Sequence, residues 1–220
     1  MHLIVGMSNS KRKNFVFCVD LDGVVADYDA AFRAFVAEET NQDPASLPPQ
    51  ETWDFTGVWG IRDRQHYIEL HNKAVNEGMF MNMPLVKGAS EALWRLNDEH
   101  EIHIRIVTHR LIIKGGHDTA VRDTVSWLQR RREDGRPIIP YRDICFIADK
   151  AEVGGDLYID DAPHNVEALR GQGFQVIVMD HAYNRHLDGP RARDWQEVEQ
   201  LVLAKMRWMA EDPLHSEPAN

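Results

Sequence analysis

The chain has 220 residues, of which 43% are hydrophobic and 27% are charged, and its formal net charge is −10 at pH 7. This length suits one large domain, or one domain with a smaller insert, and the composition is that of a folded globular protein. A negatively charged surface repels polyanions, which argues against an extended nucleic-acid interface. Any anionic ligand would have to be received by a local positive group.

The sequence also argues against a membrane or secreted protein. No apolar stretch reaches the ~20 residues that a membrane span needs. The first apolar segment is too short for a signal peptide, and the basic cluster follows that segment instead of preceding it. Cys18 and Cys145 each lie inside an apolar run, which indicates buried reduced thiols and not a disulfide. We therefore expect a cytoplasmic protein.

The first predicted element is a strand, the apolar run Phe15–Val19. The following stretch, residues 29–83, contains no strand pattern. It has helical spacing of apolar residues at 32–36, then a proline-rich turn, an aromatic-rich segment and a predicted helix around Arg64–Asn76. We interpret residues 29–83 as a small helical cap inserted after the first strand, which would act as a lid.

Predicted helices and strands alternate in the rest of the chain. Four further apolar runs predict strands, at Ile102–Val107, Ile144–Ile147, Leu157–Ile159 and Val176–Met179. Helical spacing predicts helices at 89–96, 121–128, 166–169 and 195–202. Such alternation is typical of an α/β fold with a central parallel sheet flanked by helices, a Rossmann-like arrangement. We expect a core domain of residues 14–28 and 84–210, the cap, and a flexible tail at 211–220.

Some charged residues have a structural interpretation. His103 and Arg105 alternate with isoleucines, so one face of the second strand is less buried or their stems reach to the surface. The run Arg130-Arg131-Arg132 is predicted to be the exposed last turn of a helix. The sequence has eleven histidines, but their spacing does not support a closed transition-metal site.

Polar side chains directly follow four of the predicted strands. They are Asp20 and Asp22 after the first strand, Thr108 after the second, Lys150 after the third, and Asp160 and Asp161 after the fourth. Ligands of open parallel sheets bind outside the carboxyl ends of the strands, so these groups should meet at one rim. Two negative charges 4 Å apart repel by about 4 kcal/mol at an effective dielectric constant of ~20. A cluster of carboxylates therefore needs a hard cation, and oxygen ligands suit Mg²⁺.

Magnesium keeps part of its coordination shell for phosphate oxygens, which indicates phosphoryl transfer. Asp20, at the tip of the strand, is the candidate nucleophile that forms an aspartyl-phosphate. Asp22 can protonate the leaving oxygen and later activate water. Gly23 permits the sharp turn that aims the side chains of Asp20 and Asp22 inward. Thr108 offers a hydroxyl group to the phosphate, and Lys150 supplies the balancing positive charge.

The metal ligands follow from the same arrangement. Asp161 is the candidate direct ligand, and Asp160 is expected to hold metal-bound waters in the outer shell. The side chains of Asp20 and Asp22 complete the predicted magnesium site.

These residues resemble the motifs of the haloacid-dehalogenase superfamily. Val19-Asp20-Leu21-Asp22-Gly23-Val24 resembles its first motif without a departure, Thr108 matches the threonine of its second, and Asp160-Asp161 matches the acidic pair of its fourth. The resemblance implies a haloacid-dehalogenase core with a cap. It also implies a phosphatase, because dehalogenases lack the second aspartate of the first motif, here Asp22.

Within this superfamily the chain most resembles the 5'(3')-deoxyribonucleotidases and their bacterial relatives. The shared segments are DLDGVVADY, MPLVKGASEAL, IVTHR and DKAEVGGDLYIDDAPHN, and the similarity runs over residues 14–205. It implies a magnesium-dependent 5'-nucleotidase acting on (deoxy)nucleoside monophosphates. A later segment, MDHAYNR followed by a tryptophan-containing helix, also fits the bacterial members.

One departure concerns the residues after Thr108. Animal members of the family have a small residue and a proline where this chain has His109 and Arg110. Thr-x-Arg at this place is similar to end-healing polynucleotide phosphatases, in which the arginine helps to bind phosphate. His109 and Arg110 are therefore candidate substrate-binding residues.

A second departure concerns the lysine of the third motif. In the superfamily this lysine is often on a helix, whereas Lys150 lies only ten residues before Asp160. Lys114 is therefore the alternative to Lys150 as the lysine that contacts the phosphate and a further candidate substrate-binding residue, and Arg110 could share this role.

Substrate specificity is expected to come from the cap. Its aromatic and apolar residues are candidates for stacking on a base, a contact worth roughly 1–3 kcal/mol in single-strand binding sites; they are Trp53, Phe55, Trp59, Phe80 and Met81. The alternative is that each of them belongs to the core of the cap.

The sequence is also compatible with other functions. A sugar phosphate, another small metabolite or a polynucleotide 3'-end could replace the nucleotide as substrate, although the net charge argues against the last. A receiver-like phospho-acceptor module also has an acidic pocket, a threonine and a lysine, but it carries its acidic pair on the first strand, the reverse of the order here. A homodimer is a further open alternative.

Overall fold

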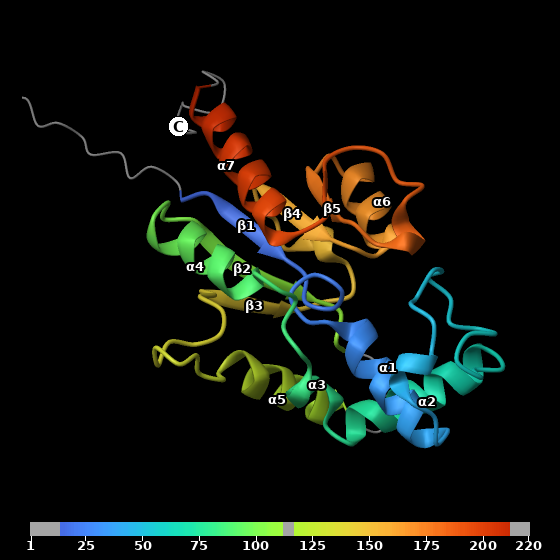
Figure 1. Ribbon diagram of the computed structural model, residues 1–220. Coiled ribbons are helices and arrows are strands. Elements are labelled where there is room, and N and C mark those ends of the chain that lie inside the picture. The colour runs from blue at the N-terminus through green and yellow to red at the C-terminus, as the bar shows by residue number, and fades with distance from the viewer. Residues whose placement is uncertain (1–13, 112–116, 212–220) are drawn as a thin grey trace, which may run out of the picture.

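The computed structural model describes residues 14–111 and 117–211 (Figure 1). Its centre is a parallel sheet of six strands in the order β3-β2-β1-β4-β5-β6. Their bounds are β1 Val16–Val19, β2 His103–Thr108, β3 Asp143–Phe146, β4 Leu157–Asp160, β5 Val176–Met179 and β6 Arg191–Ala192. The five predicted strands are confirmed. The sixth was not predicted, because two residues are too few to show a pattern.

Seven α-helices accompany the sheet within the described residues. They are α1 Tyr28–Glu39, α2 Arg64–Asn76, α3 Met79–Asn82, α4 Ala89–Asp98, α5 His117–Leu128, α6 Pro163–Gly171 and α7 Trp195–Glu211. Alternate strand residues divide between two hydrophobic clusters. Phe17 and Val19 pack in the cluster that contains α4 and α7, whereas Cys18 packs in the cluster that contains α6. The sheet is therefore covered on both faces, as the α/β prediction requires.

The strand order places a switch point between β1 and β4. From β1 the chain builds outward to β2 and β3 on one side of the sheet, and then to β4, β5 and β6 on the other. At such a point the loops after neighbouring strands diverge and leave a crevice at the carboxyl ends of the strands. Asp20 follows β1, and Asp160 is the last residue of β4.

Helices α1, α2 and α3 all lie between β1 and β2 in sequence and group together beyond one end of the sheet, beside α5 (Figure 1). Their aromatic rings pack on one another: Phe32 contacts Phe55, Trp59 and Tyr67. Helix α2 has the predicted bounds. We use the name cap for residues 29–83, although the domain boundary itself stays a prediction.

The prediction for Arg130-Arg131-Arg132 was wrong. Helix α5 ends at Leu128, and Arg131 forms a β-bridge with Pro137 instead of continuing the helix. The chain reverses between them at Gly135, whose φ of +79° is readily adopted only by glycine. A tight turn therefore follows the helix, and its geometry is not visible in a run of like charges.

The polar face of β2 is satisfied by the neighbouring strand. Asp143 of β3 lies 2.9 Å from His103 Nε2 and 2.6 Å from Arg105 Nε. Both cysteines are free thiols. Cys18 is buried, as predicted, and burial raises its pKa to about 12, whereas Cys145 is only partly buried because β3 lies at the edge of the sheet. In the described part of the chain, none of the helices is both long enough and apolar enough to span a membrane. Lys114 and residues 212–220 of the predicted tail lie outside the described residues.

Helix α7 is tied to the turn that follows β1. The indole N–H of Trp195, a buried residue, donates to the carbonyl oxygen of Val24 at 2.9 Å. We predict that Trp195→Phe lowers the free energy of unfolding by about 1–3 kcal/mol, because the buried carbonyl loses its partner. Urea denaturation measures this change.

The matched control is Trp208→Phe in the same helix, where the ring is 50% exposed. Surface substitutions usually change stability by less than about 0.5 kcal/mol. Equal losses in the two variants would contradict the assigned role of Trp195.

Candidate active site

Three carboxylates from neighbouring strand ends form one buried cluster. Asp20, Asp160 and Asp161 each offer an oxygen atom, and these oxygens lie within 4.8 Å of one another. All three side chains are buried. The donor set consists only of oxygen and comes from rigid strand ends, so it fits a hard divalent cation such as Mg²⁺.

Lys150 lies between two of these carboxylates. Its ammonium Nζ is 2.7 Å from Asp20 Oδ1 and 2.6 Å from Asp160 Oδ2. The residue starts a short 3₁₀ turn, Lys150–Glu152, in which the Asp149 side chain accepts a hydrogen bond from the N–H of Ala151 at 3.0 Å. Burial would lower the pKa of Lys150, but Asp160 and Asp20 outweigh it and raise the pKa, so the lysine is charged at pH 7.

The pKa values of two of the clustered carboxyl groups, Asp20 and Asp161, are both raised. Burial raises the pKa of Asp20 to about 7; the positive charge of Lys150 opposes that rise and the negative charge of Asp160 adds to it. The pKa of Asp161 is raised well above its usual range, first by burial and then by Asp160 and Asp20. A cation in the cluster would favour the ionised carboxylates of both residues.

The turn after β1 brings the first motif close to Asp161. The N–H groups of Val24, Val25 and Ala26 all donate to the carbonyl oxygen of Leu21, at 3.2, 2.9 and 2.8 Å. Gly23 has a φ of +73°, and a Cβ at this position would overlap the carboxylate of Asp161. The position therefore requires glycine for both its backbone and its space, as the sequence suggested.

The structure separates Asp22 from the other carboxylates. Its carboxylate is not part of the three-residue cluster but accepts from Arg110, with Nε at 3.1 Å from Oδ2 and Nη2 at 2.5 Å from Oδ1. The guanidinium also lies over the ring of Phe80, 4.1 Å from its centroid. The side-chain contacts thus do not support Asp22 as a metal ligand, and they direct Arg110 toward Asp22.

Thr108 lies at the end of β2 with a buried hydroxyl group. Its Oγ1 has no hydrogen-bond partner among the described residues. Leaving a buried hydroxyl unpaired costs about 1–3 kcal/mol, and native proteins tolerate it mainly where a ligand or water completes the bond. This orphaned hydroxyl group is consistent with the predicted contact to a phosphate oxygen.

Several supporting residues were missed by the sequence reasoning. Tyr183 donates its hydroxyl to Asp161 Oδ2, and Asn184 Nδ2 donates to the carbonyl oxygen of Asp161 at 2.8 Å. The backbone carbonyl of Gly23 is 2.7 Å from His181 Nε2. On the other side of the cluster, Asn165 Nδ2 donates to Asp160 Oδ1 at 3.2 Å.

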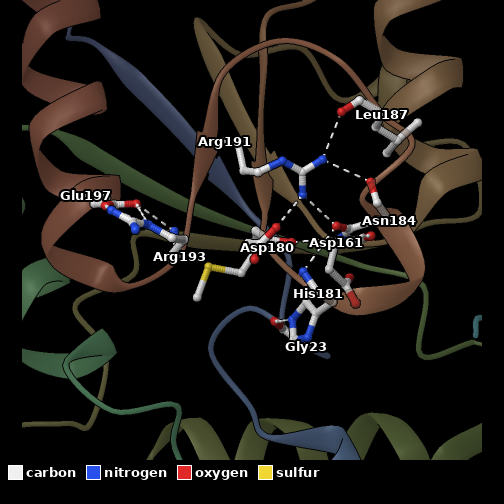
Figure 2. Close-up of polar contacts among 10 residues, drawn as sticks. Gly23, Asp161, Asp180, His181, Asn184, Leu187, Arg191, Arg193 and Glu197 are labelled. Atoms are coloured by element: carbon white, nitrogen blue, oxygen red, sulfur yellow. Dashed lines mark hydrogen bonds and ion pairs between the residues drawn. The ribbon is translucent and has the colours of Figure 1, made fainter. Parts of the chain in front are cut away.

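Figure 2 shows how the loop after β5 is held in place. Arg191 Nη1 is 2.7 Å from Asp180 Oδ1 and 2.8 Å from Asn184 Oδ1, and Nη2 donates to the carbonyl oxygen of Leu187 at 2.8 Å. These residues could have been found from the sequence, because a polar run directly follows the fifth strand, as polar residues follow the other strands that form the site.

A cavity of about 810 Å³ opens above these groups. The predicted site residues that line it are Asp20, Asp22, Gly23, Trp53, Phe80, His109, Arg110, Lys150 and Asp161. Phe55 also borders the cavity but is buried in the cap with Trp59, which does not line the cavity. Met81 is 37% exposed and lies outside the lining.

Trp53 connects the cap to the core beside this cavity. Its ring centroid is 5.3 Å from that of His164 in α6 and 5.4 Å from that of Tyr183. Three further aromatic residues of the lining, Tyr28, Tyr67 and His71, contact one another through their polar atoms. The Tyr28 hydroxyl is 3.0 Å from that of Tyr67 and 2.9 Å from His71 Nδ1. The cavity therefore has an acidic rim at the sheet and aromatic walls in the cap.

Solved structures share this fold. A crystal structure of a haloacid dehalogenase-like family protein from Streptococcus pneumoniae aligns with a TM-score of 0.53, 12% identity, and coverage of 86% of this chain and 98% of that chain. A haloacid-dehalogenase-superfamily hydrolase of subfamily IA from Geobacter sulfurreducens aligns with a TM-score of 0.50, 13% identity, and coverage of 86% and 96%. These alignments show that the chain shares its α/β fold with these hydrolases.

The family is shown by sequence. A family model described as "5' nucleotidase, deoxy (Pyrimidine), cytosolic type C protein" matches residues 14–207, and the chain belongs to this family. A Chlorobaculum tepidum protein named "Putative 5'(3')-deoxyribonucleotidase" is 39% identical over 194 residues, covering 88% of this chain and 92% of that protein. The human "5'(3')-deoxyribonucleotidase, cytosolic type" is 27% identical and covers 82% and 90%. The predicted resemblance is confirmed, and membership of this family identifies the chain as a phosphatase.

Gly23 offers a direct test of the site geometry. We predict that Gly23→Ala lowers kcat/KM for an aryl phosphate by about 10²-fold, because an added Cβ displaces the Asp161 carboxylate and an ångström of misplacement can cost that much. Steady-state kinetics at saturating Mg²⁺ measure the effect.

Gly135→Ala is the matched control. Gly135 has a φ of +79°, and a Cβ added there would meet no other atom within 4 Å, so the substitution has the same backbone cost, about 1–2 kcal/mol, without the clash. It should be less stable and fully active. Normal activity of Gly23→Ala would contradict the close packing of the turn on Asp161.

Proposed function

We propose that this phosphatase is a magnesium-dependent 5'-nucleotidase, which hydrolyses small (deoxy)nucleoside monophosphates through a phosphorylated Asp20. The observation that carries the proposal is the pairing of Asp20 with Lys150 beside Asp160 and Asp161, at the switch point of the sheet. Because the lysine contacts two carboxylates, a candidate nucleophile, a positive charge and a candidate cation site lie within a few ångströms of one another.

In the first step, an oxygen of Asp20 attacks phosphorus and the bond from phosphorus to the leaving oxygen breaks. The leaving oxygen takes a proton from the carboxyl group of Asp22, which follows Asp20 by two residues and faces the cavity. Lys150 and Thr108 would bind the phosphate oxygens, which is supported by the charge of the lysine and the unpaired hydroxyl of the threonine.

In the second step, a water molecule attacks the aspartyl-phosphate. The Asp22 carboxylate takes a proton from that water as the new oxygen–phosphorus bond forms and the bond to Asp20 breaks, which returns both residues to their starting states. Inorganic phosphate leaves, and the enzyme is ready for another cycle.

Asp20, Asp160 and Asp161 would hold the magnesium ion, because their oxygens already lie within 4.8 Å of one another. When bound, the ion supplies charge neutralisation to the phosphate and the clustered carboxylates. Tyr183 and Asn165, which bind Asp161 and Asp160, would fix the orientation of the metal-binding carboxylates.

The cap supports a substrate with a flat ring. Trp53, Tyr67 and Phe80 of the cap line the cavity, together with the neighbouring Tyr28. Aromatic walls suit a nucleobase, and the polar groups of Tyr28, Tyr67 and His71 can accept or donate hydrogen bonds. The names of the relatives point to the same substrate class.

We expect the purified protein to hydrolyse (deoxy)nucleoside 5'-monophosphates with a higher kcat/KM than sugar phosphates, because only the former fill the aromatic part of the cavity. A panel of both substrate classes at fixed Mg²⁺, with phosphate release as the readout, measures this preference. Asp20→Asn should be inactive on every substrate, including p-nitrophenyl phosphate. A clear preference for sugar phosphates would overturn the nucleotidase proposal, and turnover by Asp20→Asn would overturn the mechanism.

Magnesium should also stabilise the fold. A ligand present at 100 times its Kd stabilises the native state by about 2.7 kcal/mol, which corresponds to a rise in Tm of roughly 5–10 °C for a chain of this size. We predict such a rise on adding MgCl₂ to protein treated with EDTA, measured by thermal unfolding without substrate. Asp161→Asn should abolish the rise, whereas Asp188→Asn, at an exposed carboxylate, should keep it. An unchanged rise in Asp161→Asn would contradict the metal assignment.

A further inference from the structure

Arg110 is almost entirely enclosed by protein. The residue is only 3% exposed, and its Nε and Nη2 bind the two carboxylate oxygens of Asp22 in a fork. Its Nη1 donates to Thr124 Oγ1 at 3.1 Å, and Nη2 is also 3.0 Å from Met83 Sδ. Most of its N–H donors are thus already used by the protein, which leaves little capacity for a phosphate group.

The groups around Arg110 fix its position. Thr124 donates its own hydroxyl hydrogen to the carbonyl oxygen of Ala120 at 2.7 Å, so a lone pair of Oγ1 is available to Arg110. The guanidinium lies 4.1 Å from the ring centroid of Phe80 in α3 and 5.9 Å from that of Trp127 in α5. The indole N–H of Trp127 binds the carbonyl oxygen of Met83 at 2.8 Å, which joins α5 to the end of the cap.

The position of Asp22 depends on this arrangement. A planar guanidinium that binds both oxygens of a carboxylate restricts its rotation, which a single hydrogen bond does not. Among the described residues, Arg110 is the ion-pair partner of Asp22, and the carboxylate is 32% exposed on its cavity side. The fork therefore keeps Asp22 apart from the cluster of Asp20, Asp160 and Asp161 while leaving it open to a substrate.

We infer that Arg110 is a positioning residue for Asp22 and not a ligand of the substrate phosphate. This inference rests on the proposed function, in which Asp22 gives its proton to the leaving oxygen as the phosphorus–oxygen bond breaks. Arg110 contacts neither Asp20 nor the phosphorus centre. In the acid form of Asp22, one oxygen carries the proton that goes to the leaving group and the other keeps its hydrogen bond to Arg110, so Arg110 aims the carboxyl group at the leaving oxygen. Because it stacks on Phe80, the cap segment contributes to that aim.

The dependence on the leaving group separates these two roles. A leaving group that is a weak acid needs a proton from Asp22, whereas p-nitrophenol leaves readily as the anion. General acid catalysis contributes about 10²–10⁴-fold to a rate. We predict that Arg110→Met lowers kcat/KM for phenyl phosphate about tenfold more than for p-nitrophenyl phosphate, two substrates of nearly the same shape. Loss of a phosphate ligand would lower both values equally.

A double-mutant cycle tests whether Arg110 acts through Asp22. Asp22→Asn should show the same selective loss on phenyl phosphate, and adding Arg110→Met to it should cause no further selective loss. Additive selective losses, equal losses on both substrates, or a gain on phenyl phosphate would each overturn the inference. Arg207→Met is the matched control, because Arg207 lies at an exposed position of α7 and should leave both rates unchanged.

Arg110→Lys covers the case in which Arg110→Met does not fold. It keeps the positive charge but cannot form the fork, so it should show the same preference to a smaller degree; a folded Arg110→Lys protein without that preference would overturn the inference. Failure of the proposed mechanism is a separate result, since wild-type protein would then hydrolyse neither aryl phosphate or Asp20→Asn would still hydrolyse both. Failure of the nucleotide preference alone would appear only in the substrate panel and would leave this test intact.

Discussion

The site depends on the burial of three carboxylates and one lysine at the junction of β1 and β4. Lys150 contacts both Asp20 and Asp160, and its charge compensates part of the repulsion that would otherwise separate the acidic groups. The compensation is incomplete, because three carboxylates face one ammonium group and the pKa of Asp20 stays raised at about 7. The remaining negative charge is what a cation would neutralise in the proposed function.

The scaffold around the cluster comes from parts of the chain that are far apart in sequence. Gly23 allows the turn after β1 to pack against Asp161, while Tyr183 and Asn184 hold the same aspartate from the loop after β5. Arg191 in β6 fixes that loop through Asp180 and Asn184. A strand of only two residues therefore has a defined role, which is to anchor the loop that orients the side chain of Asp161.

Parallel strands explain why much of the fold and site could be predicted. Asp20, Thr108, Lys150 and the pair Asp160-Asp161 each come at or near the end of an apolar run, and all parallel strands present their carboxyl ends on one side. The same rule would have identified Asp180 and His181 after β5. It could not identify the tight turn at Gly135 that ends the helical pattern before Arg131, or the burial of Trp59 in the cap.

The sequence by itself determined the class of chemistry, the positions along the chain of the strands that carry it, and the family. These depend on local periodicity and on motifs a few residues long. The tertiary structure decided which groups meet. Arg110 follows Thr108 by two residues and could have faced a phosphate, yet it binds Asp22 across 88 positions of sequence. Side-chain direction at the end of a strand depends on what packs around it, here Phe80, Thr124 and Trp127, and no local pattern contains that information.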